Sequence, residues 1–156
     1  MALQVGTKVP DFSAPATGNQ YFNVADYKGQ CLVMYFYPKD STSGCTTQGQ
    51  EFNRLLSEFN AANCQIFGIS RDTLKQHEKF KEKQNFSFDL ISDVDEQLCQ
   101  LFDVIRKKKL YGREYLGIDR STFVIDQKAN LVQIWRGVKI KGHAEEVLKF
   151  VRTMSV

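Results

Sequence analysis

Cys45 is the residue of this 156-residue chain that is best placed to do chemistry. It follows a polar turn, residues 41–44, and stands in the first turn of an expected helix. Unpaired backbone N–H groups and the positive end of the helix dipole stabilise an anion at such a position. They favour the thiolate, which is the nucleophilic form of cysteine. The position therefore indicates nucleophilic thiol chemistry, although a lone cysteine is more often a small packing residue.

Two elements are expected to position this thiol. Residues 31–37, with the sequence CLVMYFY, form an uninterrupted apolar run that is typical of a strand buried on both faces. Pro38 ends that strand because it has no N–H group to donate. The hydroxyl residues of the turn can cap the helix that follows. That helix is predicted from an apolar stripe with helical spacing, namely Phe52, Leu55, Leu56 and Phe59.

The other segments predict an α/β protein with a central mixed sheet flanked by helices. A short hairpin is expected over residues 12–24, and one helical turn over 24–29. Further strands are expected at 64–70, 88–92, 121–126 and 131–135, and helices at 72–83, 95–102 and 143–154. Crossover connections make the middle strands parallel, whereas the last two strands form an antiparallel hairpin. The length suits one domain, residues 1–156.

Composition excludes several other classes of protein. A net charge of +3 and the absence of basic runs interleaved with aromatic residues argue against nucleic-acid binding. The densest basic cluster, residues 106–109, is interpreted as a solvated helix end or loop. No apolar run is long enough to span a membrane, and no signal peptide is apparent. Four irregularly spaced cysteines without an export signal favour a reducing compartment, so a cytoplasmic location is expected.

The residues around Cys45 form a specific motif. Pro38, Thr42 and Cys45 have the spacing P-x-x-x-T-x-x-C, and residues 36–46 read FYPKDSTSGCT. This segment closely resembles the active-site segment of peroxiredoxins, most of all the bacterioferritin comigratory protein group, also called the Q type. The resemblance extends from VGTKVPDF at residues 5–12 to RSTFVID at residues 120–126. It implies a thioredoxin-like fold with the hairpin as an N-terminal extension, and a thiol-specific peroxidase without cofactor or metal.

The resemblance also implies roles for four residues. Cys45 would reduce hydrogen peroxide or small organic hydroperoxides and become a sulfenic acid. Thr42 would bond the thiolate and the peroxide oxygens, and Pro38 would shield the site from water. Arg120, in the sequence DRSTF, matches the arginine of the family that favours the thiolate and holds the oxyanion. The electrons would come from thioredoxin or a small thiol, and a monomer or weak dimer is expected.

One departure from the group concerns resolution of the sulfenic acid. Many members carry a resolving cysteine five residues after the reactive one, where this chain has Gln50; Ser43 also replaces a usual proline. Cys31 and Cys64 begin strands and are expected roughly 20 Å away, at the opposite edge of the sheet. Cys99 is expected on the active-site side, where packing is its more common role; a disulfide with Cys45 would need Cα atoms within about 7 Å.

The sequence therefore favours a one-cysteine peroxidase and leaves alternatives open. One is a redox-sensing or holdase-like protein switched by oxidation of Cys45, and another is a two-cysteine peroxidase resolved by Cys99. A thiol–disulfide oxidoreductase is disfavoured because no C-x-x-C pair is present, which also argues against a zinc site. His77 and His143 are expected to be solvated and to have no catalytic role.

Overall fold

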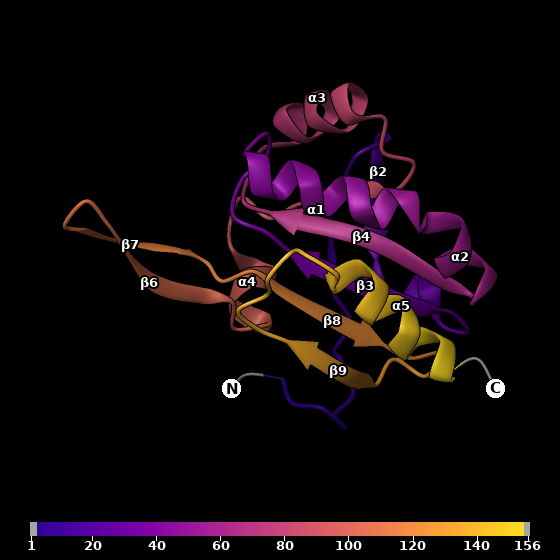
Figure 1. Ribbon diagram of the computed structural model, residues 1–156. Coiled ribbons are helices and arrows are strands. Elements are labelled where there is room, and N and C mark those ends of the chain that lie inside the picture. Colours follow the sequence, from indigo (N-terminus) through magenta and orange to yellow (C-terminus); the bar gives the residue numbers. More distant parts are fainter. Residues whose placement is uncertain (1–2, 155–156) are drawn as a thin grey trace.

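The computed structural model describes residues 3–154 and is built on a seven-stranded mixed sheet (Figure 1). The strand order is β2-β1-β5-β4-β3-β8-β9. Strands β3, β4 and β5 are parallel, whereas β8 is antiparallel to β3 and β9 is antiparallel to β8. The predicted α/β class and strand directions are confirmed. The strands are β1 (Ser13–Ala16), β2 (Gln20–Asn23), β3 (Cys31–Phe36), β4 (Cys64–Ser70), β5 (Asp89–Ser92), β8 (Ser121–Ile125) and β9 (Leu131–Trp135).

Strand β3 is the centre of the fold because all six of its residues are buried. Side chains of a strand alternate between the two faces of the sheet. Met34 and Phe36 belong to the apolar core on one face, and Val33 and Tyr35 belong to the core on the other. The continuous apolar sequence of β3 follows from this double burial.

The helices divide between the two faces of the sheet. One face is covered by α1 (Ser43–Arg54), α2 (Leu56–Ala61), α3 (Leu74–Gln84) and α5 (His143–Met154). Figure 1 shows α1, α2 and α5 crossing in front of the sheet. The other face packs against the 3-10 turn η1 (Val24–Tyr27) and α4 (Gln97–Leu101). The single helix predicted after Cys45 is two helices, because Leu55 leaves helical geometry between α1 and α2.

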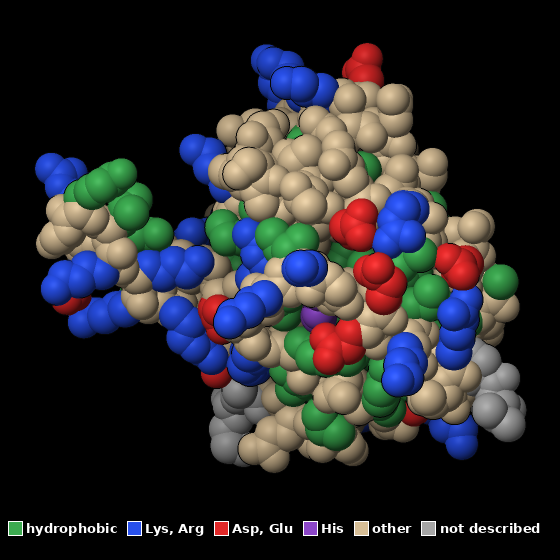
Figure 2. All heavy atoms as spheres, in the orientation of Figure 1, with side chains coloured by type: hydrophobic (Ala, Val, Ile, Leu, Met, Phe, Trp, Pro, Cys, Tyr) green, Lys and Arg blue, Asp and Glu red, His purple; other side chains and the backbone are tan. Residues whose placement is uncertain are grey.

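A two-stranded hairpin, β6 (Ile105–Leu110) with β7 (Arg113–Ile118), projects away from the main sheet (Figure 1). The interpretation of residues 106–109 as a helix end or loop is wrong, since they lie in β6. Tyr111 and Gly112 close the hairpin, both with positive φ, at 51° and 77°. Two such residues make the tight turn that matches the twist of paired strands. Basic side chains cover this arm in Figure 2, namely Arg106, Lys107, Lys108, Lys109 and Arg113.

Within residues 3–154, none of the helices has both the length and the apolar character needed to cross a membrane.

Candidate active site

Cys45 is the third residue of α1, as the sequence predicted. The chain reaches it from the end of β3 through a loop that contains Pro38, which is half-buried. Thr42 is the N-cap residue of α1, but its side chain does not cap the helix. Its hydroxyl donates instead to the Lys39 carbonyl oxygen at 2.9 Å. The first turn of α1 is therefore not capped by Thr42, which leaves its amide groups available to an anion.

Arg120 is brought to Cys45 by strand pairing. It directly precedes β8, whose first residue, Ser121, is the register partner of Phe36 at the end of β3. The Nη2 atom of Arg120 lies 3.6 Å from the Sγ atom of Cys45 and donates a hydrogen bond to it. A cationic donor at this distance stabilises negative charge on sulfur.

Gln48 completes this arrangement, and the sequence reasoning missed it. Its Oε1 atom accepts a hydrogen bond of 2.6 Å from Nη1 of Arg120, so the guanidinium bridges Gln48 and the thiol. Gln48 is buried, and its Nε2 atom has no hydrogen-bond partner among the described residues. A signal did exist, because residues three apart on a helix share a face, and Gln48 is three residues after Cys45.

The thiol itself is well shielded, since Cys45 is only 2% exposed. Gly44 lets Ile140 and Arg120 pack closely beside the start of α1. A Cβ atom at position 44 would lie 3.2 Å from Cδ1 of Ile140 and 3.4 Å from Nη2 of Arg120. A cleft of about 550 Å³ runs beside the start of α1. Its walls include Ser43, Gly44, Thr47, Glu51, Ile140 and Lys141. Cys45 does not line this cleft, but its neighbour Gly44 does.

The structure places all four candidate residues at the same end of β3. Cys45 and Arg120 are in direct contact, and Pro38 and Thr42 lie in the loop that joins β3 to α1. The Thr42 hydroxyl donates to the loop backbone, at the Lys39 carbonyl oxygen, rather than to Cys45.

A buried polar network anchors the loop between β3 and α1 through Asp40. Asp40 accepts a hydrogen bond of 2.6 Å from the Tyr37 hydroxyl, and its other carboxylate oxygen lies 2.6 Å from Nδ1 of His77. Nε2 of His77 donates to the Ile91 carbonyl oxygen at 2.9 Å. The backbone amide of Asp40 donates to Asp72 at 2.9 Å. Burial, together with neighbouring Tyr35 and Asp40, raises the pKa of Tyr37 well above its usual range, so Tyr37 remains a donor.

The prediction that His77 is solvated is wrong, because its side chain is fully buried. Charged neighbours in the sequence suggested exposure, but His77 and Phe80 are three apart and share the inward face of α3. His143 was also predicted to be solvated and is buried instead, with Nε2 lying 2.8 Å from the Thr122 hydroxyl. Burial lowers the pKa of His143, which favours its neutral form.

Replacing His77 with alanine is expected to lower the free energy of unfolding by about 3 kcal/mol, because it leaves Asp40 and the Ile91 carbonyl buried without their partner. Urea unfolding at neutral pH followed by circular dichroism measures the change. Lys79→Ala is the matched control, since Lys79 lies exposed on the same helix. Equal, small effects of the two substitutions would show that the network contributes little to stability.

The remaining cysteines are separated from Cys45 in two different ways. Cys99 is fully buried in the core on the face of the sheet opposite Cys45. Burial and the neighbouring Asp93 raise the pKa of Cys99, which disfavours its thiolate. The expectation that Cys99 lies on the active-site side is therefore wrong as regards the face of the sheet, since the sheet separates Cys99 from Cys45. Cys31 and Cys64 share the face of Cys45 but lie at the starts of β3 and β4, at the far edge.

Comparison with known proteins gives concordant matches. Residues 5–134 match the model of the AhpC/TSA family. A Peroxiredoxin Bcp of Xanthomonas campestris is 50% identical over 146 residues, which cover 94% of this chain and 91% of that protein. The Peroxiredoxin Bcp of Bacillus subtilis is 42% identical over 155 residues, with 99% of both chains covered.

Solved structures agree with the sequence matches. The bacterioferritin comigratory protein of Xanthomonas campestris, solved in work on its alkyl peroxide reduction activity, has a TM-score of 0.91 and 45% identity, with 99% of this chain and 98% of that chain covered. A PrxQ mutant of Xylella fastidiosa has a TM-score of 0.94 and 41% identity, with 100% and 99% covered. The predicted thioredoxin-like fold is thereby confirmed. The chain belongs to the AhpC/TSA family and is a peroxiredoxin of the bacterioferritin comigratory, or Q, type, a thiol-dependent peroxidase that reduces peroxides.

Proposed function

We propose that Cys45 is the residue that attacks the peroxide, and that Arg120, Thr42 and Pro38 assist it. The observation that carries this proposal is the contact of 3.6 Å between the Arg120 guanidinium and the Cys45 sulfur. Gln48 adds support, because its hydrogen bond to the other guanidinium nitrogen holds Arg120 in that orientation. A positioned cation of this kind can stabilise both the thiolate and the charge that develops on oxygen.

The reaction then proceeds as a displacement at oxygen. The Cys45 thiolate attacks one peroxide oxygen, the O–O bond breaks, and the sulfur becomes a sulfenic acid. The leaving oxygen takes up a proton and departs as water or an alcohol. Arg120 holds that oxygen while its negative charge grows, and the Thr42 hydroxyl, which borders the site, orients the peroxide. Pro38 keeps water from the end of β3, and the cleft beside α1 leaves room for the organic part of small hydroperoxides.

We propose that an external thiol resolves the sulfenic acid, so that Cys45 is the only cysteine in the catalytic cycle. Gln50, at the usual resolving position, is exposed and donates a hydrogen bond of 3.0 Å to Gln84 of α3. Cys99 lies behind the sheet, and Cys31 and Cys64 lie at its far edge. This distribution supports resolution from outside the chain. Slow resolution would expose the sulfenic acid to a second peroxide molecule and to overoxidation.

The reductant is proposed to be thioredoxin or a small thiol, acting in a reducing compartment such as the cytoplasm. All four cysteines are free, as such a compartment requires. We also propose that residues 1–156 act as one domain, because both core clusters pack on one sheet. A monomer or weak dimer is proposed as its state in solution.

Cys99→Ser tests the one-cysteine mechanism. After one equivalent of peroxide under non-reducing conditions, the wild-type protein is expected to contain Cys45 sulfenic acid and no internal disulfide to Cys99. The variant is expected to keep wild-type turnover with thioredoxin and with a small thiol, because the sheet separates Cys99 from Cys45. Intact-mass spectra and steady-state peroxide consumption measure the two outcomes. A Cys45–Cys99 disulfide in the wild type, together with lost turnover in the variant, would establish a two-cysteine mechanism instead.

A further inference from the structure

Cys31 and Cys64 form a close pair at the edge of the sheet away from Cys45. They are register partners at the starts of the parallel strands β3 and β4, and both side chains belong to the core on the same face. The Cys64 thiol donates to the Gln65 carbonyl oxygen at 3.9 Å, and Cys31 is near enough to help raise the pKa of Cys64. Neighbouring strands lie about 4.8 Å apart. That spacing falls within the Cα separation of roughly 4.4–6.8 Å that disulfides adopt.

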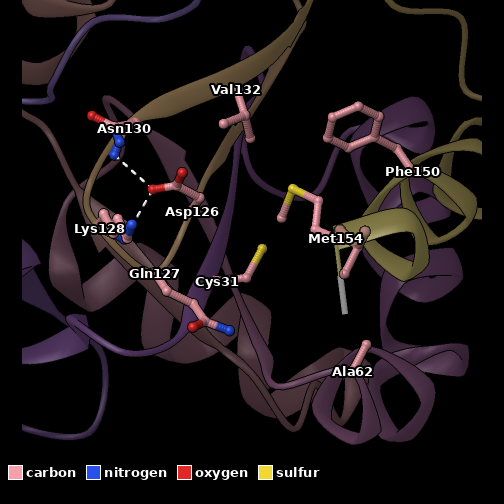
Figure 3. Close-up of a pocket in the computed structure, with 10 residues that line it drawn as sticks. Cys31, Ala62, Asp126, Gln127, Lys128, Asn130, Val132, Phe150 and Met154 are labelled. Carbon is pink, nitrogen blue, oxygen red and sulfur yellow. Dashed lines mark hydrogen bonds between the residues drawn. The ribbon is translucent and has the colours of Figure 1, made fainter. Parts of the chain in front are cut away.

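The pair can be approached from solvent through a hollow of about 510 Å³. Cys31 is one of its lining residues, and Figure 3 shows the sulfur of Cys31 pointing into it, on the side of Met154. Asp126 also lines the hollow, but its carboxylate accepts hydrogen bonds of 2.9 Å from the backbone amides of Lys128 and Asn130. Cys64 does not line the hollow and is fully buried. Cys31 is itself only 3% exposed, so a small oxidant in the hollow reaches Cys31 through this narrow opening before it reaches Cys64.

This pair is separate from the site that reduces peroxide. The run from Cys31 to Pro38 spans roughly 20 Å at the rise of an extended strand. The sulfenic acid of Cys45 therefore lies out of reach of both thiols in the folded chain. Any oxidation of Cys31 and Cys64 must come from an oxidant that enters the hollow.

We propose that Cys31 and Cys64 are a second redox site, which hydroperoxides oxidise to an intramolecular disulfide between β3 and β4. In the first step, the Cys31 sulfur attacks a peroxide oxygen and the O–O bond breaks. The thiol proton passes to the leaving oxygen, so Cys31 sulfenic acid and water or an alcohol are formed. In the second step, the Cys64 sulfur attacks the Cys31 sulfur, and the hydroxyl group leaves with the Cys64 proton as water. Two thiols are oxidised by two electrons in total, and one peroxide is reduced.

The second step is expected to be slow. Burial raises the pKa of the Cys64 thiol, and the neighbouring Cys31 adds to that rise, so little Cys64 thiolate is present to attack the Cys31 sulfenic acid. Once formed, the disulfide would join the two ends of the segment that carries α1, α2 and Cys45. Closing this loop restricts the unfolded chain, so the oxidised protein should melt at a higher temperature than the reduced protein.

The experiment uses the Cys45→Ser variant, which keeps three cysteines and lacks the fast reaction. The fully reduced variant is treated with excess hydrogen peroxide for increasing times, then denatured and alkylated. Two alkylation sites are expected to disappear together, with loss of the mass of two hydrogen atoms. A non-reducing digest should yield a peptide linked through Cys31 and Cys64, and dithiothreitol should restore both alkylation sites. The melting temperature should rise with the linked fraction.

Two further variants control the assignment. Adding Cys99→Ser should leave the linked product unchanged, whereas adding Cys31→Ser should abolish it. Oxygen atoms added to single cysteines without a linked peptide would overturn the proposal, as would persistence of all three alkylation sites. Formation of the link only when peroxide is added in denaturant would overturn it too, because the folded pair would then be inert. The result does not depend on the role assigned to Cys45, whose own substitution is tested by turnover.

Discussion

Replacing Cys45 with serine is expected to abolish peroxide reduction while the chain keeps its fold. Sulfur and oxygen differ little in size, so the packing beneath α1 should survive, but a serine hydroxyl does not supply a thiolate at neutral pH. Arg120 would also no longer stabilise a negative charge at position 45, because the serine hydroxyl is neutral. Steady-state consumption of hydrogen peroxide with a dithiol reductant measures the loss, and circular dichroism measures the fold.

Cys99→Ser is the matched control for this substitution. It makes the same chemical change at a second buried cysteine, on the other face of the sheet. Its peroxidase rate is expected to remain near that of the wild type. If Cys45→Ser retained more than a small fraction of the wild-type rate, the attacking group would have to be a different residue.

Replacing Arg120 with lysine is expected to lower the second-order rate constant for peroxide by roughly 10²–10³, the loss typical of removing one oxyanion donor. The guanidinium reaches Cys45 with one nitrogen and Gln48 with the other, and an ammonium group lacks this planar fork. Positive charge is retained, so the variant tests geometry rather than charge alone. Stopped-flow measurement of the reduced enzyme with hydrogen peroxide gives the rate constant.

The step that follows provides a second readout. Reduction of the sulfenic acid by an external thiol should slow much less than its formation, because that step does not require the displaced peroxide oxygen to be held. Arg113→Lys is the control, since Arg113 is exposed on the projecting hairpin. An unchanged peroxide rate constant in Arg120→Lys would mean that the 3.6 Å contact contributes nothing to the transition state.

Local sequence patterns determined most of the fold and the position of the thiol. The apolar run of β3, the proline that ends it and the helical stripe after Cys45 each depend on contacts between near neighbours, so they could be recognised without tertiary structure. The final helix, α5, was predicted with the bounds that the structure has, because Val147, Leu148 and Val151 keep helical spacing. The peroxiredoxin motif added Thr42, Pro38 and Arg120 as candidates by resemblance.

Errors arose where a side chain's surroundings come from distant segments. The burial of His77 could not be inferred from its charged neighbours in the sequence, since its hydrogen-bond partners, Asp40 and the Ile91 carbonyl, lie on other elements. The hairpin β6–β7 was missed because its cationic sequence resembles a solvated loop, and its turn uses Tyr111 with Gly112 rather than the more usual Asn-Gly pair.

The sequence alone placed Cys45 at the start of a helix and showed that Gln50 replaces the usual resolving cysteine. The sequence also placed Cys31 and Cys64 at the far edge of the sheet, where the structure has them. Only the tertiary structure decided which groups contact the Cys45 thiol and on which face of the sheet Cys99 lies. Strand pairing sets Arg120 beside Cys45, although 75 positions separate them in the chain. The same sheet places Cys99 on its opposite face, because order along the chain does not specify which face a connecting helix covers. Parallel register, which no local pattern encodes, brings Cys31 against Cys64.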